Sequence, residues 1–130
     1  MAALKLIALP DLFAVCKLSA SAAPPAWAAA GAFSSLTRSP TELSIVCREQ
    51  DVPLDVNAER GWRCLRVAGP LEFSLVGILA SLLDPLAQAG IAVFVVSTFD
   101  TDYLLFKADS FDRAALALGA AGHEVAEESG

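Results

Sequence analysis

Basic residues are scarce in this sequence. Nine lysines and arginines stand against fifteen aspartates and glutamates, which gives a formal net charge of −6. A protein that binds nucleic acid needs a basic stripe or patch to meet the phosphates. The one local group of arginines, Arg60, Arg63 and Arg66 around Trp62, we interpret as charge at a strand edge. We therefore expect no nucleic-acid partner.

Residues that bind metals or act as nucleophiles are also few. His123 is the only histidine, and Cys16, Cys47 and Cys64 form no C-x-x-C pair. An odd number of widely spaced cysteines indicates reduced, mostly buried thiols in a cytoplasmic protein and argues against a zinc site. The sequence also contains no G-x-S-x-G, Walker or G-x-G-x-x-G motif. We expect no metal, no cofactor and no catalytic residue, and hence no enzyme.

Long unbroken hydrophobic runs are missing as well. The longest uncharged stretch, residues 18–37, contains two prolines, a glycine and several serines, and its apolar content is mainly alanine. Such a stretch does not predict a membrane span. The N-terminus imitates a signal peptide, but Pro10-Asp11 and Lys17 interrupt the apolar segment that secretion requires. We expect a cytoplasmic protein with no membrane partner.

Apolar side chains are abundant, at 55% of the 130 residues, and only 18% of residues are charged. This balance predicts a folded chain, either one compact domain or two small halves that share a core. In the first half we expect a hairpin of strands at 4–9 and 12–18, a small alanine-rich helix between Pro24 and Gly31, and strands at 33–37 and 42–48.

The second half has a clearer order of elements. We expect a strand at 62–67, a helix at 73–89, strands at 91–96 and 103–107, a helix at 110–121 and a last strand at 123–126. This β-α-β-β-α-β order is that of a ferredoxin-like unit. In that topology the strands at 62–67 and 91–96 run parallel, so the junction at Gly69 and the turn at 97–102 leave the sheet at the same end.

Two features predict that this half has a neighbour. The run 91–96 is apolar without alternation, which is typical of a strand buried on both faces. The helix at 73–89 carries more apolar residues than a single buried stripe needs. Because helices cover only one face of a ferredoxin-like sheet, either the first half or another chain must cover the other face. We expect a homodimer or a higher homo-oligomer.

The junction after the strand at 62–67 is the candidate for ligand binding. Free backbone N–H groups and the helix dipole make the segment 69–74 receptive to a carboxylate. Asp100 and Asp102, in the turn at 97–102, place negative charge at the same end of the sheet. From composition alone, an ordinary β-turn is the better explanation of these two aspartates and needs no chemistry, since aspartate favours turns.

Three blocks of the second half are informative when taken together. They read Phe73-Ser74-Leu75-Val76-Gly77-Ile78-Leu79, Pro85-Leu86-Ala87-Gln88-Ala89-Gly90-Ile91 and Ser97-Thr98-Phe99-Asp100-Thr101-Asp102-Tyr103-Leu104-Leu105. These blocks resemble the ACT domain of the bacterial relatives of the CASTOR arginine sensors. Residues 33–37 and 41–46 are similar to the first ACT-like half of those proteins, so the resemblance spans about residues 3–126.

The resemblance implies an α+β fold of two ACT-like, ferredoxin-like units, each an antiparallel sheet with helices packed on one face. A degenerate first unit would span 1–58 and a second βαββαβ unit 62–128. ACT domains are regulatory modules that generally bind amino acids and pair side by side, with ligands near the loop before the first helix. Carried onto this chain, the implied ligand-binding residues are Gly69, Phe73, Ser74, Leu75, Val76, Ser97, Thr98, Phe99, Asp100, Thr101 and Asp102.

The expected function is therefore sensing of an amino acid or similar small zwitterion at an ACT–ACT interface. The helix start near Phe73 and Ser74 would take the carboxylate, and Asp100 or Asp102 the ammonium group. No catalytic domain accompanies the two units, so we expect any regulated protein to be separate. One alternative is a dimerisation or interaction module that binds no ligand, with its pocket filled by Phe73 or Phe99. An enzyme that uses the carboxylate pair would lack a positioned base, nucleophile or metal.

Overall fold

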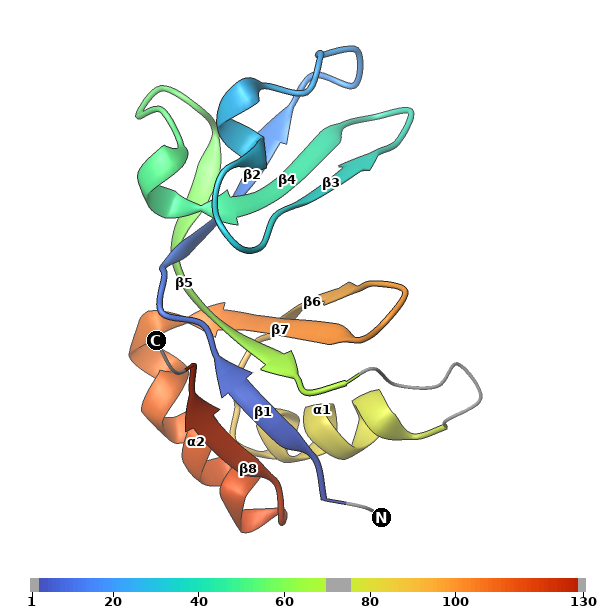
Figure 1. The fold of residues 1–130 in the computed structure, drawn as a ribbon, viewed down its shortest axis with the longest axis vertical. Helices are drawn as coiled ribbons and strands as arrows, with labels where there is room; N and C mark the ends of the chain where they lie inside the picture. The colour runs from blue at the N-terminus through green and yellow to red at the C-terminus, as the bar shows by residue number, and fades with distance from the viewer. Residues whose placement is uncertain (1–2, 70–75, 129–130) are drawn as a thin grey trace. The chain divides into compact units, whose positions relative to one another are not determined.

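The computed structural model describes residues 3–69 and 76–128, and the chain divides into two compact units (Figure 1). The large unit comprises Met1–Pro10 and Arg63–Gly130, and the small unit comprises Asp11–Trp62. Strand β5 (Ala58–Val67) begins in the small unit and ends in the large one. The predicted boundary, between 1–58 and 62–128, therefore differs from the observed division at the N-terminus, because the first ten residues join the large unit.

The small unit is built on three antiparallel strands. β2 (Phe13–Leu18) pairs with β4 (Leu43–Arg48), and β4 pairs with β3 (Ser35–Arg38). The first residues of β5 pair with β2. The predicted alanine-rich helix is a short 3₁₀ helix (Ala26–Ala29), and another follows at Glu49–Asp51.

The large unit carries the predicted β-α-β-β-α-β order. Its elements after β5 are α1 (Ile78–Gln88), β6 (Phe94–Ser97), β7 (Asp102–Lys107), a 3₁₀ turn (Ala108–Ser110), α2 (Phe111–Ala120) and β8 (Glu124–Glu127). The α+β class and the ferredoxin-like fold are thus confirmed. Within this unit the strand order is β8-β1-β5-β7-β6, with β1 (Lys5–Ala8) as a strand added from the N-terminus.

The predicted hairpin of the two first strands is wrong. β1 pairs antiparallel with β5, with Leu6 opposite Val67, and parallel with β8, with Leu6 opposite Val125. β2 pairs instead with β4 and β5. The apolar side chains of β1 explain its position, because Leu6 and Ala8 are fully buried in the core of the large unit.

The core of the large unit joins one face of the sheet to both helices. Its buried members are Leu6, Ala8, Leu65, Val67, Leu82, Leu86, Ile91, Leu104, Phe106, Ala114 and Leu118. Side chains alternate between the two faces of a strand, so one face of β1, β5 and β7 packs on α1 and α2. The helices therefore lie on one face of this sheet, as predicted.

Two element boundaries differ from the predictions. The helix expected from Phe73 begins at Ile78, directly after Gly77, whose φ of +77° lies in the left-handed region that suits glycine. The strand expected from Ile91 begins at Phe94. Residues 93–96 are half-buried in the single chain, so the predicted burial of this run on both faces is not reached there. In the described residues no helix is long and apolar enough to cross a membrane.

Candidate functional site

The end of β5 and the turn between β6 and β7 are joined by a hydrogen bond. The hydroxyl of Thr101 donates to the carbonyl oxygen of Val67 over 2.7 Å, and Thr101 is only 8% exposed. The predicted meeting of the Gly69 junction with the turn at 97–102 is therefore present in the structure.

The turn itself is closed by Thr98. Its backbone N–H donates to the carbonyl oxygen of Thr101 over 2.8 Å. Its hydroxyl donates to the same oxygen at 3.1 Å and accepts the N–H of Thr101 at 3.2 Å. The hydroxyl groups of Thr98 and Thr101 thus both donate to carbonyl oxygens of the protein itself. The two threonines therefore shape the site rather than donate to a ligand.

A cavity of about 240 Å³ opens beside this turn. It is lined by Arg66, Gly69, Thr98, Asp100, Thr101 and Tyr103. Leu65 and Val67 face the helices, so Arg66 between them faces the opposite side of the sheet. Tyr103 precedes the helix-facing Leu104 and therefore lies on the same side as Arg66. The cavity is at the end of the sheet, on the side away from α1 and α2.

Two opposite charges line this cavity. Neither Arg66 nor Asp100 forms an ion pair with any residue that the structure describes. Both charges act on Tyr103, which lines the same cavity. Burial raises the pKa of Tyr103 above its ordinary value, the Arg66 guanidinium opposes this shift, and the Asp100 carboxylate adds to it. The phenol therefore stays protonated at neutral pH, as a neutral hydrogen-bonding group in the site.

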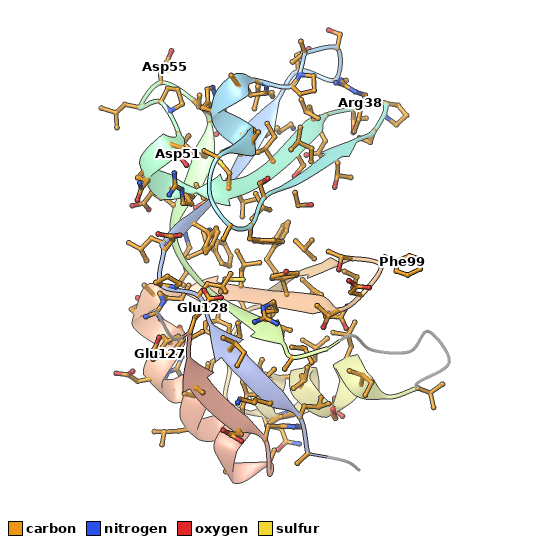
Figure 2. The ribbon with its side chains drawn as sticks, viewed as in Figure 1. Arg38, Asp51, Asp55, Phe99, Glu127 and Glu128 are labelled. Atoms are coloured by element: carbon orange, nitrogen blue, oxygen red, sulfur yellow. The ribbon has the colours of Figure 1, made fainter. Side chains whose placement is uncertain are left out.

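Several residues of the predicted site lie elsewhere. Asp102 does not line the cavity, and its carboxylate accepts a hydrogen bond from the Ser97 hydroxyl across the β6–β7 pair. Phe99 is 79% exposed and points away from the tip of the turn (Figure 2). Val76 is 87% exposed and precedes the helix. The predictions for Phe73, Ser74 and Leu75 lie outside the described residues.

Sequence analysis missed two lining residues, Arg66 and Tyr103. The sequence patterns predict Arg66 only as charge at a strand edge, and Tyr103 only as the first residue of the strand at 103–107. The alternation of apolar and charged residues along β5 could have identified Arg66. Arg66 lies between the apolar, buried Leu65 and Val67, three residues before Gly69. That pattern assigns it to the face away from the helices at the end of β5.

The single histidine has a structural role. The His123 ring is 7% exposed, and its Nδ1 accepts the backbone N–H of Leu4 over 3.1 Å. Its Nε2 lies 3.1 Å from the carbonyl oxygen of Ser81, to which the Nε2–H tautomer donates. In the part of the chain that the structure describes, no three metal-ligating side chains come together. The three cysteines are free and buried.

Comparison with known families gives this site a context. The family model of the ACT domain matches residues 57–119, which include β5, α1, β6, β7 and most of α2. The chain contains an ACT domain. A second family model, which describes an N-terminal domain, matches residues 11–55, within the small unit. Every lining residue of the cavity belongs to the ACT domain.

Among curated proteins, the chain is similar to the human protein named cytosolic arginine sensor for mTORC1 subunit 1. The two are 38% identical over 60 residues, which is 45% of this chain and 18% of the human protein. The aligned part therefore spans less than a fifth of that relative.

Solved structures extend the similarity over the whole chain. Protein Atu0741 from Agobacterium tumefaciens is 42% identical, with a TM-score of 0.94 over 100% of this chain and 97% of that one. The regulatory subunit of aspartate kinase from Thermus thermophilus has a TM-score of 0.60 at 11% identity, covering 86% of this chain and 93% of that one. The second comparison shows a shared fold only.

Proposed function

We propose that this protein is a regulatory module that binds a small amino acid, or a similar zwitterion, in the cavity beside the β6–β7 turn. The observation that carries the proposal is the pair of opposite charges, Arg66 and Asp100, that line one small cavity. The ACT domain and the similarity to an arginine sensor support the ligand class. The cavity is smaller than the usual range of about 300–1,000 Å³ for drug-sized ligands, which favours a small ligand.

The proposed mechanism is charge matching at the two ends of the ligand. The planar guanidinium of Arg66 donates two parallel hydrogen bonds to the carboxylate of the amino acid. The carboxylate of Asp100 accepts from the ammonium group. In this proposal the ligand's carboxylate binds Arg66 instead of the helix start that was expected near Phe73. The ammonium group binds Asp100 rather than Asp102.

The role that follows is regulation without catalysis. The described lining offers charge and hydrogen bonds but no nucleophile beside a base. Binding would act on a separate partner protein in the cytoplasm, and on a second copy of this chain. β6 leads directly into the turn that lines the cavity, so a copy paired along β6 would place the cavity beside an ACT–ACT interface.

Ligand-dependent thermal stabilisation tests the proposal. A cognate amino acid at about one hundred times its dissociation constant stabilises a protein by roughly 2.7 kcal/mol, or about 10 °C for a chain of this length. We expect one or a few of the twenty amino acids to produce such a shift. The shift should nearly vanish in Arg66→Met and in Asp100→Asn.

Asp102→Asn is the matched control, because it removes the same charge from the same turn without touching the cavity lining. It should keep the full ligand shift. Equal losses in Asp100→Asn and Asp102→Asn would contradict the assignment of the ammonium group to Asp100.

The second candidate function is an interaction module that binds no ligand. β6 favours it, since Phe94–Ser97 is an uncharged strand that pairs, among the described strands, with β7 alone. Against it, Phe99, one of the two residues expected to fill a vestigial pocket, does not line the cavity. If no amino acid shifts the melting temperature of the wild-type protein, this second function replaces the first.

A further inference from the structure

Strand β8 is the open edge of the large unit at the end of the chain. Among the described strands it pairs only with β1. The backbone N–H groups of Glu124 and Glu128 donate to the carbonyl oxygens of Leu4 and Ala8, respectively, over 2.9 Å each. In a parallel pair, the odd-numbered residues between them then direct their backbone N–H and C=O groups away from β1. Val125 and Glu127 therefore present a short hydrogen-bonding edge to a further strand.

An apolar groove runs beside this edge. It has a volume of about 560 Å³ and is lined by Phe111, Asp112, Ala115, Leu116, Gly119, Val125, Ala126 and Glu127. Leu116 is 74% exposed within it, although it is a large apolar side chain on α2. A Cβ atom added at Gly119 would meet nothing within 4 Å, so the floor of the groove is open at that point.

Acidic side chains border the groove and the strand edge. Glu124 and Glu127 are exposed on β8, Glu128 is exposed directly after it, and Asp112 lies on α2. Glu127 and Glu128 are labelled in Figure 2. One cation approaches them. The Arg63 guanidinium lies 4.1 Å from the ring centre of Phe111 and 3.6 Å from the carboxylate of Glu127. The other three acids form no ion pair with any residue that the structure describes, and they leave this surface negative.

We propose that the β8 edge and its groove form a docking surface for an extended basic segment of another protein. The segment adds as a strand to β8, through the outward N–H and C=O groups of Val125 and Glu127. Its alternate side chains then serve two purposes. Apolar ones enter the groove against Leu116, and lysines or arginines lie beside the surrounding carboxylates. This surface is separate from the proposed amino-acid cavity and goes beyond that function.

Charge excludes a second copy of this chain as the occupant. In the antiparallel register centred on Ala126, which pairs the outward groups of Val125 and Glu127, Glu124 of one copy would stand opposite Glu128 of the other. Like charges directly opposite each other destabilise a strand pair. A basic segment turns the same acids into favourable cross-strand partners, which is why the occupant is a basic partner.

Peptide binding to the full chain tests the proposal. The probe is a fluorescent eight-residue peptide of alternating lysine and valine, and the control is the same peptide with glutamate in place of lysine. We expect the lysine peptide to bind, to lose affinity as salt is raised, and to shift the amide NMR signals of β8. The glutamate peptide should not bind. Equal binding of the two peptides, or shifts confined to other strands, would overturn the proposal.

Gly119 provides a matched pair of variants. Gly119→Phe fills the groove. Gly119→Ala also replaces the glycine of α2 by a residue with a Cβ atom, but it leaves the groove open. We expect at least a tenfold loss of peptide affinity in Gly119→Phe and none in Gly119→Ala, with both proteins folded by circular dichroism. The double variant Glu124→Gln with Glu128→Gln should weaken binding and flatten its salt dependence. If Gly119→Phe bound as tightly as wild type, or if it lowered the oligomeric mass in light scattering, the proposal would be wrong.

Discussion

The Thr101 hydroxyl donates a hydrogen bond to the carbonyl oxygen of Val67 over 2.7 Å, between residues 34 positions apart in the chain. Val67 is the last residue of β5 and is fully buried, and Thr101 is the residue before β7. This contact fixes the turn at 97–102 against the end of β5. It thereby holds Asp100 on the same cavity as Arg66.

Replacing Thr101 by valine tests the importance of that contact. Valine has nearly the same shape but no hydroxyl, so the Val67 carbonyl loses its partner. A buried polar group left without a partner costs about 1–3 kcal/mol, which chemical denaturation would measure as a lower free energy of unfolding. Thr101→Ser keeps the hydroxyl and should lose clearly less. Equal destabilisation by valine and serine would mean that the methyl group, rather than the hydrogen bond, matters.

The topology of the large unit was predictable because local patterns encode it. Glycines mark the element ends at Gly90 and Gly122, and the apolar spacing separates helices from strands. The meeting of Gly69 with the turn at 97–102 followed from the β-α-β-β-α-β order alone. In the same way, the order of the elements alone assigns Thr98, Asp100 and Thr101 to one end of the sheet.

The pairing of β1 and the place of Arg66 in the cavity lining were not predictable from the same patterns. β1 and β2 follow one another across Pro10-Asp11, which resembles a hairpin turn, yet β1 is buried between β5 and β8. That choice depends on which core has room for Leu6 and Ala8, a property of the whole fold. Arg66 lines the cavity because the register of β5 places it on the face away from the helices.

Removal of the His123 ring should destabilise the large unit. Leu4 N–H and Ser81 C=O would lose their partners at the two ring nitrogens. We expect His123→Phe to lower the free energy of unfolding by about 2–4 kcal/mol, measured by urea titration. His123→Asn restores an acceptor at the Nδ1 position and His123→Gln a donor near Nε2, so each should recover part of the loss. Full stability in the phenylalanine variant would show that neither hydrogen bond contributes.

The protein is expected to self-associate through β6. Residues 93–96 are only half-buried in the single chain, and the strand carries no charge that would oppose pairing with a copy. Light scattering at micromolar concentration should return at least twice the chain mass of 13.5 kDa. Val95→Lys, which places a charge on this strand, should reduce the mass towards that of one chain. A wild-type mass of one chain would contradict the expectation.

The Cys64 thiol should make stability depend on pH in the alkaline range. The side chain is fully buried, and its burial raises the pKa of the thiol from 9.0 to about 12. The folded protein therefore holds this proton more tightly than the unfolded chain does. The stability that the protonated Cys64 thiol contributes is fully present below pH 9 and is lost as pH rises towards 12, because only the unfolded thiol ionises in that window.

The variant Cys64→Ala removes the thiol. The difference in the free energy of unfolding between wild type and this variant should therefore shrink between pH 8.5 and pH 10.5, because a shift of one pKa unit is worth about 1.4 kcal/mol. Urea titrations under reducing conditions at both pH values measure this difference, and all other ionisable groups cancel in the comparison. A difference that stays constant with pH would show that the thiol does not remain protonated in the folded state.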